Sequence, residues 1–135
     1  MSTTTTTSNS VLRARSKQTT LTTTQDIGAN AAGSEINIAT DAIVLSLPAI
    51  TAENIGAEFT FRNTGADAAN IITISPDAAD SINGAVAAVS SDGTAGKDWI
   101  NTKATSTKGD WVTLKAVALT EWYITGGDGV WASEA

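Results

Sequence analysis

Short runs of alternating apolar and polar residues recur along the chain, the period expected of β-strands that bury one face. Ile36 and Ile38 alternate with Glu35 and Asn37, and Phe59 and Phe61 alternate with Glu58, Thr60 and Arg62. Similar short runs include Ile43, Leu45 and Leu47; Ile72 and Ile74; Trp99 and Ile100; residues 111–117; residues 122–125; and Val130 with Trp131. Because helical periodicity is nearly absent, the sequence predicts an all-β fold, a single antiparallel β-sandwich or jelly-roll-like domain.

Turn-forming residues separate these runs. Pro48 and Pro76 each close an apolar run, because proline has no N–H to give to a β-ladder. Asn83-Gly84, between Ile82 and Val86, predicts a hairpin with a two-residue type I′ turn, since both central positions of that turn need positive φ.

Two further segments carry local predictions. The last three apolar runs, residues 111–117, 122–125 and 130–131, predict an antiparallel meander joined by tight turns. Residues 49–56 interrupt the strand pattern, and we expect one helical turn there, ended by Gly56, that caps one end of the sandwich.

The first eighteen residues differ in character from the rest. Residues 2–10 are nearly all Ser and Thr, which bury too little apolar surface to offset the entropy of ordering. An apolar pair and three cations at alternate positions follow: Val11, Leu12, Arg13, Arg15 and Lys17. In an extended chain the three cations share one face. We therefore expect residues 1–18 to form a flexible basic N-terminal arm and residues 19–135 to form the sandwich domain.

Charge divides the chain in nearly the same place. The first twenty residues hold three basic residues and no acidic one, whereas the remainder holds all fourteen acidic residues against five basic ones. A solvated basic tail and an arm lying on a partner's acidic groove both agree with this division. An acidic body repels nucleic acid and anionic bilayers, and no window approaches the length of a membrane span. We expect neither nucleic acid nor membrane as a partner.

The chain has no His and no Cys, which removes the usual groups of catalytic and zinc sites. Two carboxylate pairs stay open as glycosidase-like candidates, although acidic residues on turns are more often solvated: Asp77 with Asp80, and Asp98 with Asp110. Residues 91–94 and 126–129 are loops with oxygen ligands, but they lack the spacing of a calcium loop. We expect no enzyme, no cofactor and no metal site.

Four tryptophans lie in the C-terminal third of the chain: Trp99, Trp111, Trp122 and Trp131. They could form a stacking platform for sugar rings, as in a carbohydrate-binding module. Alternatively they are the large side chains of a core or subunit interface that is otherwise built from Ala, Val and Ile. We favour the core or the interface.

Several short sequence segments follow one another in the C-terminal half: residues 65–76, Asp80-Ser81-Ile82-Asn83-Gly84, Gly109-Asp110-Trp111-Val112-Thr113-Leu114, residues 121–124 and residues 127–131. In their residue types and their spacing, these segments resemble β-rich structural modules of tailed-bacteriophage virions, and the resemblance covers about residues 19–131. Such modules occur in head decoration (cement) proteins, head fibres and the tail-fibre apparatus. A single small domain without a long repetitive shaft favours the head, and the N-terminal arm resembles those by which trimeric cement proteins embrace neighbouring capsid subunits.

The resemblance implies a structural virion protein, made in the host cytoplasm, that binds the outside of the assembled capsid and stabilises it. Its expected partners are the major capsid protein and two further copies of itself in a homotrimer. We expect Arg13, Arg15 and Lys17 to contact acidic capsid surface, Val11 and Leu12 to be apolar anchors, and Leu21 to take part in β-augmentation or docking into a neighbour. The alternative is a phage fibre or tail receptor-binding module that recognises a cell-surface glycan through the tryptophan-bearing loops.

Overall fold

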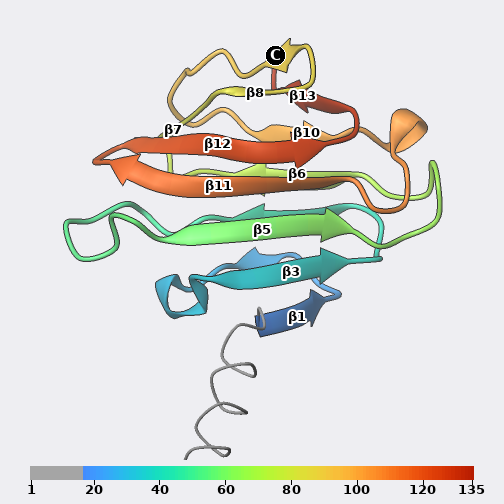
Figure 1. Ribbon diagram of the computed structural model, residues 1–135, viewed down its shortest axis with the longest axis horizontal. Coiled ribbons are helices and arrows are strands. Elements are labelled where there is room, and N and C mark those ends of the chain that lie inside the picture. Colours follow the sequence, from blue (N-terminus) through green and yellow to red (C-terminus); the bar gives the residue numbers. More distant parts are fainter. Residues whose placement is uncertain (1–16) are drawn as a thin grey trace, which may run out of the picture.

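A computed structural model describes residues 17–135, which form two β-sheets packed as a sandwich and one small separate hairpin (Figure 1). The six-stranded sheet has the order β1 (Lys17–Leu21), β3 (Ser34–Ile38), β5 (Glu58–Asn63), β11 (Trp111–Ala118), β12 (Glu121–Asp128), β7 (Ser81–Asn83). The five-stranded sheet has the order β13 (Trp131–Ser133), β10 (Trp99–Asn101), β6 (Ile72–Ser75), β4 (Ile43–Ser46), β2 (Gln25–Asp26). The hairpin pairs β8 (Ala85–Val86) with β9 (Val89–Ser90). Two short 3-10 helices, η1 (Ala29–Ala31) and η2 (Lys103–Thr105), complete the described part.

The expected all-β sandwich is confirmed, but its sheets are mixed instead of antiparallel. Strands β1, β3 and β5 are mutually parallel in one sheet, and β2, β4 and β6 are mutually parallel in the other. This follows from the path of the chain, which crosses between the sheets after each of these strands. When the chain crosses to the other sheet and back, the returning strand runs in the same direction as the strand that it left. The parallel strands that pair in each sheet are therefore not consecutive in the sequence.

The core lies between the sheets and follows the predicted alternation. On β11, Val112, Leu114 and Ala116 are buried, while the residues between them face outward. Trp99 and Trp131 stack with ring centroids 6.3 Å apart and planes 2° apart. Trp122 packs against Phe59, with ring centroids 5.9 Å apart. These three tryptophans are buried in the core of the chain itself.

Three predictions about local structure are wrong in whole or in part, and the first concerns Asn83-Gly84. Asn83 ends β7, which pairs in parallel with β12, so Asn83-Gly84 is not a hairpin turn. Gly84 instead has φ +109° where the chain passes β12, and a Cβ there would lie 3.1 Å from the Cβ of Ile124. The adjacent tight hairpin is β8–β9, with Ala87 at φ +54°. The cause lies in the tertiary structure, because the chain leaves the six-stranded sheet after Asn83 instead of turning back to pair with β7.

The C-terminal meander is correct for its first hairpin only. β11 and β12 are antiparallel neighbours, but β13 crosses to the other sheet and pairs with β10, which places Trp131 against Trp99. Residues 49–56 form turns and no helix. Gly56, at φ +96°, donates its N–H to the carbonyl of Ala116 at 2.7 Å, so this segment is held by the end of β11.

A buried polar network joins the two sheets beside the apolar core. Asn63 at the end of β5 donates to Oδ1 of Asn101 on β10 at 2.9 Å. Asn101 donates in turn to Oδ2 of Asp110 at 3.0 Å, and the same oxygen accepts the N–H of Thr107 at 2.9 Å. Each of the three network side chains, Asn63, Asn101 and Asp110, is buried. Because an unpaired buried donor is costly, the network holds the sheets in one relative position.

Asp110→Ala should lower the free energy of unfolding by at least about 1–3 kcal/mol, because Asn101 and Thr107 lose their shared buried acceptor. Asp110→Asn keeps an oxygen and should cost less. Urea unfolding followed by tryptophan fluorescence measures both values. The control is Asp77→Ala at an exposed position, expected to change stability by about 0.5 kcal/mol or less. Equal stability of Asp110→Ala and the control would refute this structural role.

Candidate interaction surfaces

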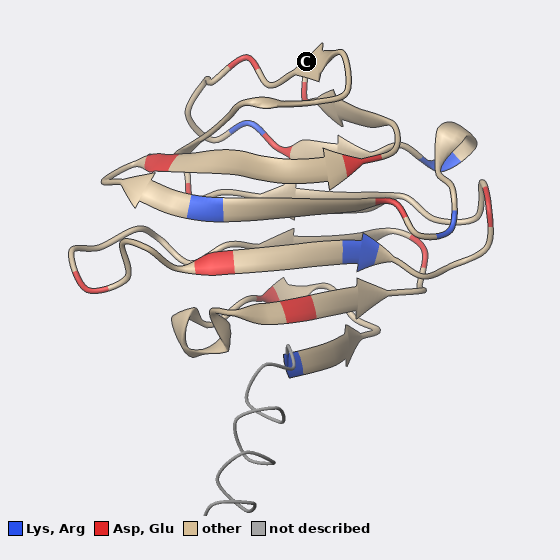
Figure 2. Cartoon of the chain, in the orientation of Figure 1, with Lys and Arg blue, Asp and Glu red and all other residues tan. Residues whose placement is uncertain are grey.

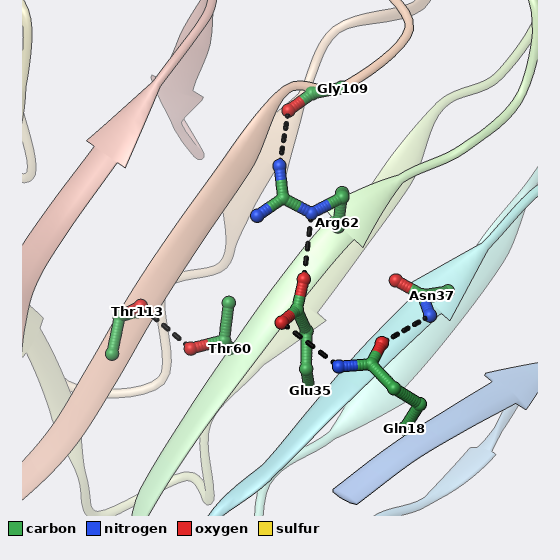
Figure 3. A network of polar contacts seen from close by, with 7 residues as sticks. All are labelled: Gln18, Glu35, Asn37, Thr60, Arg62, Gly109 and Thr113. Carbon is green, nitrogen blue, oxygen red and sulfur yellow. Dashed lines mark hydrogen bonds and ion pairs between the residues drawn. The ribbon is translucent and has the colours of Figure 1, made fainter. Parts of the chain in front are cut away.

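The outer face of the six-stranded sheet carries a hydrogen-bonded row of polar side chains that crosses three strands (Figure 3). Nε of Arg62 lies 2.8 Å from Oε1 of Glu35, and Nη1 of Arg62 donates to the carbonyl of Gly109 at 3.1 Å. Gln18 on β1 donates to Oε2 of Glu35 at 3.2 Å and accepts from Asn37 at 2.9 Å. The row ties edge strand β1 to β3 and β5, so its groups are already occupied.

Glu35 is the centre of this row. The hydrogen bond from Arg62, then that from Gln18, lowers the pKa of Glu35 below its ordinary value. Burial acts against this shift, but the pair is still partly open to solvent. A carboxylate held in this way is a structural anion and not a proton donor near neutral pH.

Trp111 is the one tryptophan of the four that lies on an outer face. It is half-buried on β11, with the guanidinium carbon of Arg62 5.9 Å from the centre of its ring. A Cβ on Gly126 would stand 3.1 Å from the Cη2 atom of Trp111, so the glycine leaves room for the ring to lie along β12. The prediction of core or interface thus fits Trp99, Trp122 and Trp131, whereas Trp111 alone is available for stacking.

The outer face of the five-stranded sheet has a different character. Strand register places Val44, Thr73, Ile100 and Ala132 in one row across β4, β6, β10 and β13. All four side chains are half-buried and none is charged. A flat, uncharged row of this kind can pack against another protein surface without leaving a buried charge.

One end of the sandwich exposes apolar side chains. Ile55, Val117 and Leu119 are 44%, 52% and 57% exposed. They belong to the 52–56 turn and the β11–β12 hairpin, which meet where Gly56 and Ala57 hydrogen-bond to Ala116 (Figure 1). This apolar end is a second surface suited to protein contact.

Three of the four candidate carboxylates, those of Asp77, Asp80 and Asp110, accept hydrogen bonds within the fold. Oδ2 of Asp80 accepts the N–H of Ile50 at 3.1 Å, and Asp110 belongs to the buried network. Asp77 accepts from its own turn, and the backbone N–H of Asp98 is bonded to the carboxylate of Glu134. Residues 17–135 contain no group of three or more acidic side chains placed to hold a metal ion.

The two candidate cation loops are also explained by local structure. Asp92 and Asp128 cap their own turns, accepting the N–H of Thr94 at 2.8 Å and of Gly129 at 2.9 Å. Residues 126–128 belong to strand β12, so the expectation of a loop there is wrong. The pairing of β12 with β11 through Gly126 and Gly127 accounts for the difference.

The predicted arm falls mostly on residues outside the described part: Val11, Leu12, Arg13 and Arg15. Lys17 and Gln18, assigned to the arm from sequence, are the first residues of β1. Leu21 at the other end of β1 lies opposite Ile38 and packs against the chain's own core. Acidic positions are spread over the strands and loops of the described body (Figure 2), and the first basic position of that body is Lys17.

A cavity opens between the two sheets where they end in β1 and β2. Its volume is about 270 Å³. Leu21, Ile27 and Ile36 form apolar parts of its wall, and Lys17 and Asp26 also line it. Sequence reasoning missed this cavity, because nothing in the local pattern shows that β1 and β2 face one another at the open side of the sandwich.

Comparison with known proteins finds no matching family model and no similar curated protein. Within residues 17–135, no helix combines the length and the apolar character required to cross a bilayer. The surfaces described above therefore carry the functional argument.

Replacing Glu35 by Gln should lower stability at pH 7 by up to about 1 kcal/mol, the range of partly exposed ion pairs. Glu35 has a lower pKa folded than unfolded, so its carboxylate stabilises the fold above the ordinary glutamate pKa of about 4.3. That contribution disappears as the pH falls through the folded pKa. Urea unfolding at pH 7 and at about pH 3 should therefore show the two proteins converging in acid. A stability difference that does not shrink in acid would contradict this assignment.

Proposed function

We propose that this chain is a structural virion protein of a tailed bacteriophage, which binds the outside of the assembled capsid and stabilises it. The observation that carries the proposal is the position of the basic segment. Arg13, Arg15 and Lys17 directly precede or begin an edge strand of a sandwich that holds all fourteen acidic residues. A cationic segment next to an acidic domain attracts an acidic partner surface, whereas the acidic domain itself repels it.

The described body supports a binding role in three ways. Three of its four candidate carboxylates are engaged in turns and in the buried network, its polar sheet face is internally satisfied, and it presents two apolar or uncharged contact surfaces. These are the row Val44, Thr73, Ile100, Ala132 and the end with Ile55, Val117 and Leu119.

Stabilisation would follow from mass action. A subunit that binds only the assembled, expanded lattice lowers the free energy of that lattice by its own binding free energy. A homotrimer would multiply the contacts, because each further subunit binds at the high effective concentration set by the first. In this proposal Arg13, Arg15 and Lys17 contact acidic groups of the major capsid protein, and Val11 and Leu12 supply apolar anchoring.

Immunogold electron microscopy of intact particles of the parent virus tests the location. Antibody raised against residues 17–135 should label the whole surface of the head. Label confined to the tail end would favour the receptor-binding alternative, and absence of label from purified particles would refute a virion role.

The triple variant Arg13→Glu, Arg15→Glu, Lys17→Glu should reduce binding to purified capsids by about tenfold or more, because attraction to acidic capsid groups becomes repulsion. Cosedimentation at low salt measures this, and wild-type binding should weaken as salt rises. The matched control, Lys97→Glu, Lys108→Glu, Lys115→Glu, changes net charge equally within the body. If both triple variants lose binding to the same extent, overall charge and not the basic segment is responsible.

A fibre or tail module that binds a cell-surface glycan is the second candidate. The half-buried Trp111 beside Arg62 is the observation that favours it. Since the other three tryptophans are buried, this candidate depends on one ring. It requires saccharide-dependent quenching of fluorescence that Trp111→Phe removes, whereas capsid decoration requires none.

A further inference from the structure

We infer that the open edge of the sandwich accepts the N-terminal segment of a second copy of this chain, which adds a strand beside β1 and places Leu12 in the cavity between β1 and β2. The inference deepens the proposed function by naming a self-partner, but its geometric basis is independent of any capsid.

Strand β1 is an unprotected edge. It is five residues long, whereas the other terminal strands of the two sheets, β7, β13 and β2, have three, three and two residues. Among residues 17–135 no strand pairs with its outer side. Free N–H and C=O groups along such an edge are a template for another strand.

The cavity beside this edge has room and a suitable lining for an apolar side chain. Its volume of about 270 Å³ exceeds the roughly 150 Å³ that holds a benzene-sized group in a protein core. Leu21, Ile27 and Ile36 form apolar parts of its wall. Ser34, also in the wall, is buried, and its hydroxyl has no hydrogen-bond partner within residues 17–135. The wall therefore suits a segment that brings an apolar side chain and also a hydroxyl or backbone polar group.

Strand alternation decides which side chains of the segment would enter. Lys17, Thr19 and Leu21 line the cavity from β1, so a strand added beside β1 would send alternate residues in the same direction. One phase of the segment presents Ser10, Leu12 and Ala14, and the other presents Val11, Arg13 and Arg15. The wall already holds one cation, Lys17, beside its one carboxylate, Asp26, so two further guanidinium groups would lack partners there and would cost more than a leucine. Leu12 is therefore the residue that enters.

The donor is a second copy because the chain's own segment is poorly suited to return. It would have to reverse at Arg15-Ser16 to lie beside β1, and neither residue is among the Gly, Asn or Asp that tight hairpin turns require. Leu12 stands five residues before Lys17, the first residue of β1, and an extended chain covers roughly 3.3 Å per residue, so Leu12 can lie up to about 17 Å from that residue. A second copy whose β1 edge packs close to that of the first lies within this reach.

This arrangement separates two tasks along one segment. Leu12 and Ala14 face the neighbouring copy, while Val11, Arg13 and Arg15 lie on the opposite face and stay available to the capsid. If each copy gives its N-terminal segment to the next, the exchange closes into a dimer or a ring, and each copy covers the β1 edge of another.

Sedimentation velocity of the full chain tests the assembly. The wild type should form an oligomer, and Leu12→Asp should raise the concentration of half-dissociation by about tenfold or more, because a charge replaces a buried apolar group. The control Val11→Asp makes the same change on the other face and should leave the oligomer intact. A wild type that is monomeric at every concentration, or equal dissociation of both variants, would overturn the inference.

Disulfide trapping identifies the occupied site. The chain has no cysteine, so Leu12→Cys protein mixed with Ala31→Cys protein reports one contact between copies. Oxidation should link the two variants, whereas Val11→Cys mixed with Ala31→Cys should link far less. A Leu12→Cys, Ala31→Cys double variant that closes only within its own chain would exclude the second copy. Capsid binding by a protein that fails these tests would remove this inference and leave the proposed function standing.

Discussion

The structure depends on burying one face of each sheet against the other while the chain crosses repeatedly between them. From β1 to β6 the chain crosses after every strand, and the strands of each sheet in this part run parallel, as in β1, β3 and β5. At the ends of β5 and β10 the apolar core is closed by the bonds among Asn63, Asn101 and Asp110. No such network exists among the described residues between the edge strands β1 and β2, and the cavity lies there. The core is therefore closed by hydrogen bonds at these strand ends and open at the β1–β2 edge.

The strands themselves could be predicted from sequence because alternation is a local property. The apolar runs around Ile36, Phe59, Ile72 and Trp122 all lie in strands, and their buried residues are those in phase. Pairing could not be predicted in the same way, since it depends on where a loop takes the chain. Asn83-Gly84 has the residues of a hairpin turn, yet β7 pairs with β12, nearly forty positions away, because burying Ile82 beside Trp122 outweighs a local turn.

The sequence pattern indicated two of the three buried network residues, but the third resembled an ordinary turn residue. Asn63 follows Phe59 and Phe61 in the same phase, and Asn101 follows Trp99 in the same way, so both were due to face the core. A polar residue in an apolar phase indicates a buried hydrogen-bonding group. Asp110 stands just before β11 and gave the appearance of a turn carboxylate or a catalytic candidate, and only the fold shows that it accepts from Asn101. Trp111 could not be separated from the other tryptophans by sequence, because its outward direction depends on Val112 being the residue that packs inward.

In the proposed function, the edges and outer faces of the two sheets make the contacts. The sheet face with Glu35 and Arg62 is internally satisfied, which stabilises β1 against fraying without offering free groups to a ligand. Holding β1 in place keeps its outer edge and the neighbouring cavity in a fixed position relative to the core. The strand order places β1 at the edge of the six-stranded sheet, so among residues 17–135 only its inner side is paired, and its outer side is the place where the proposed assembly would add a strand.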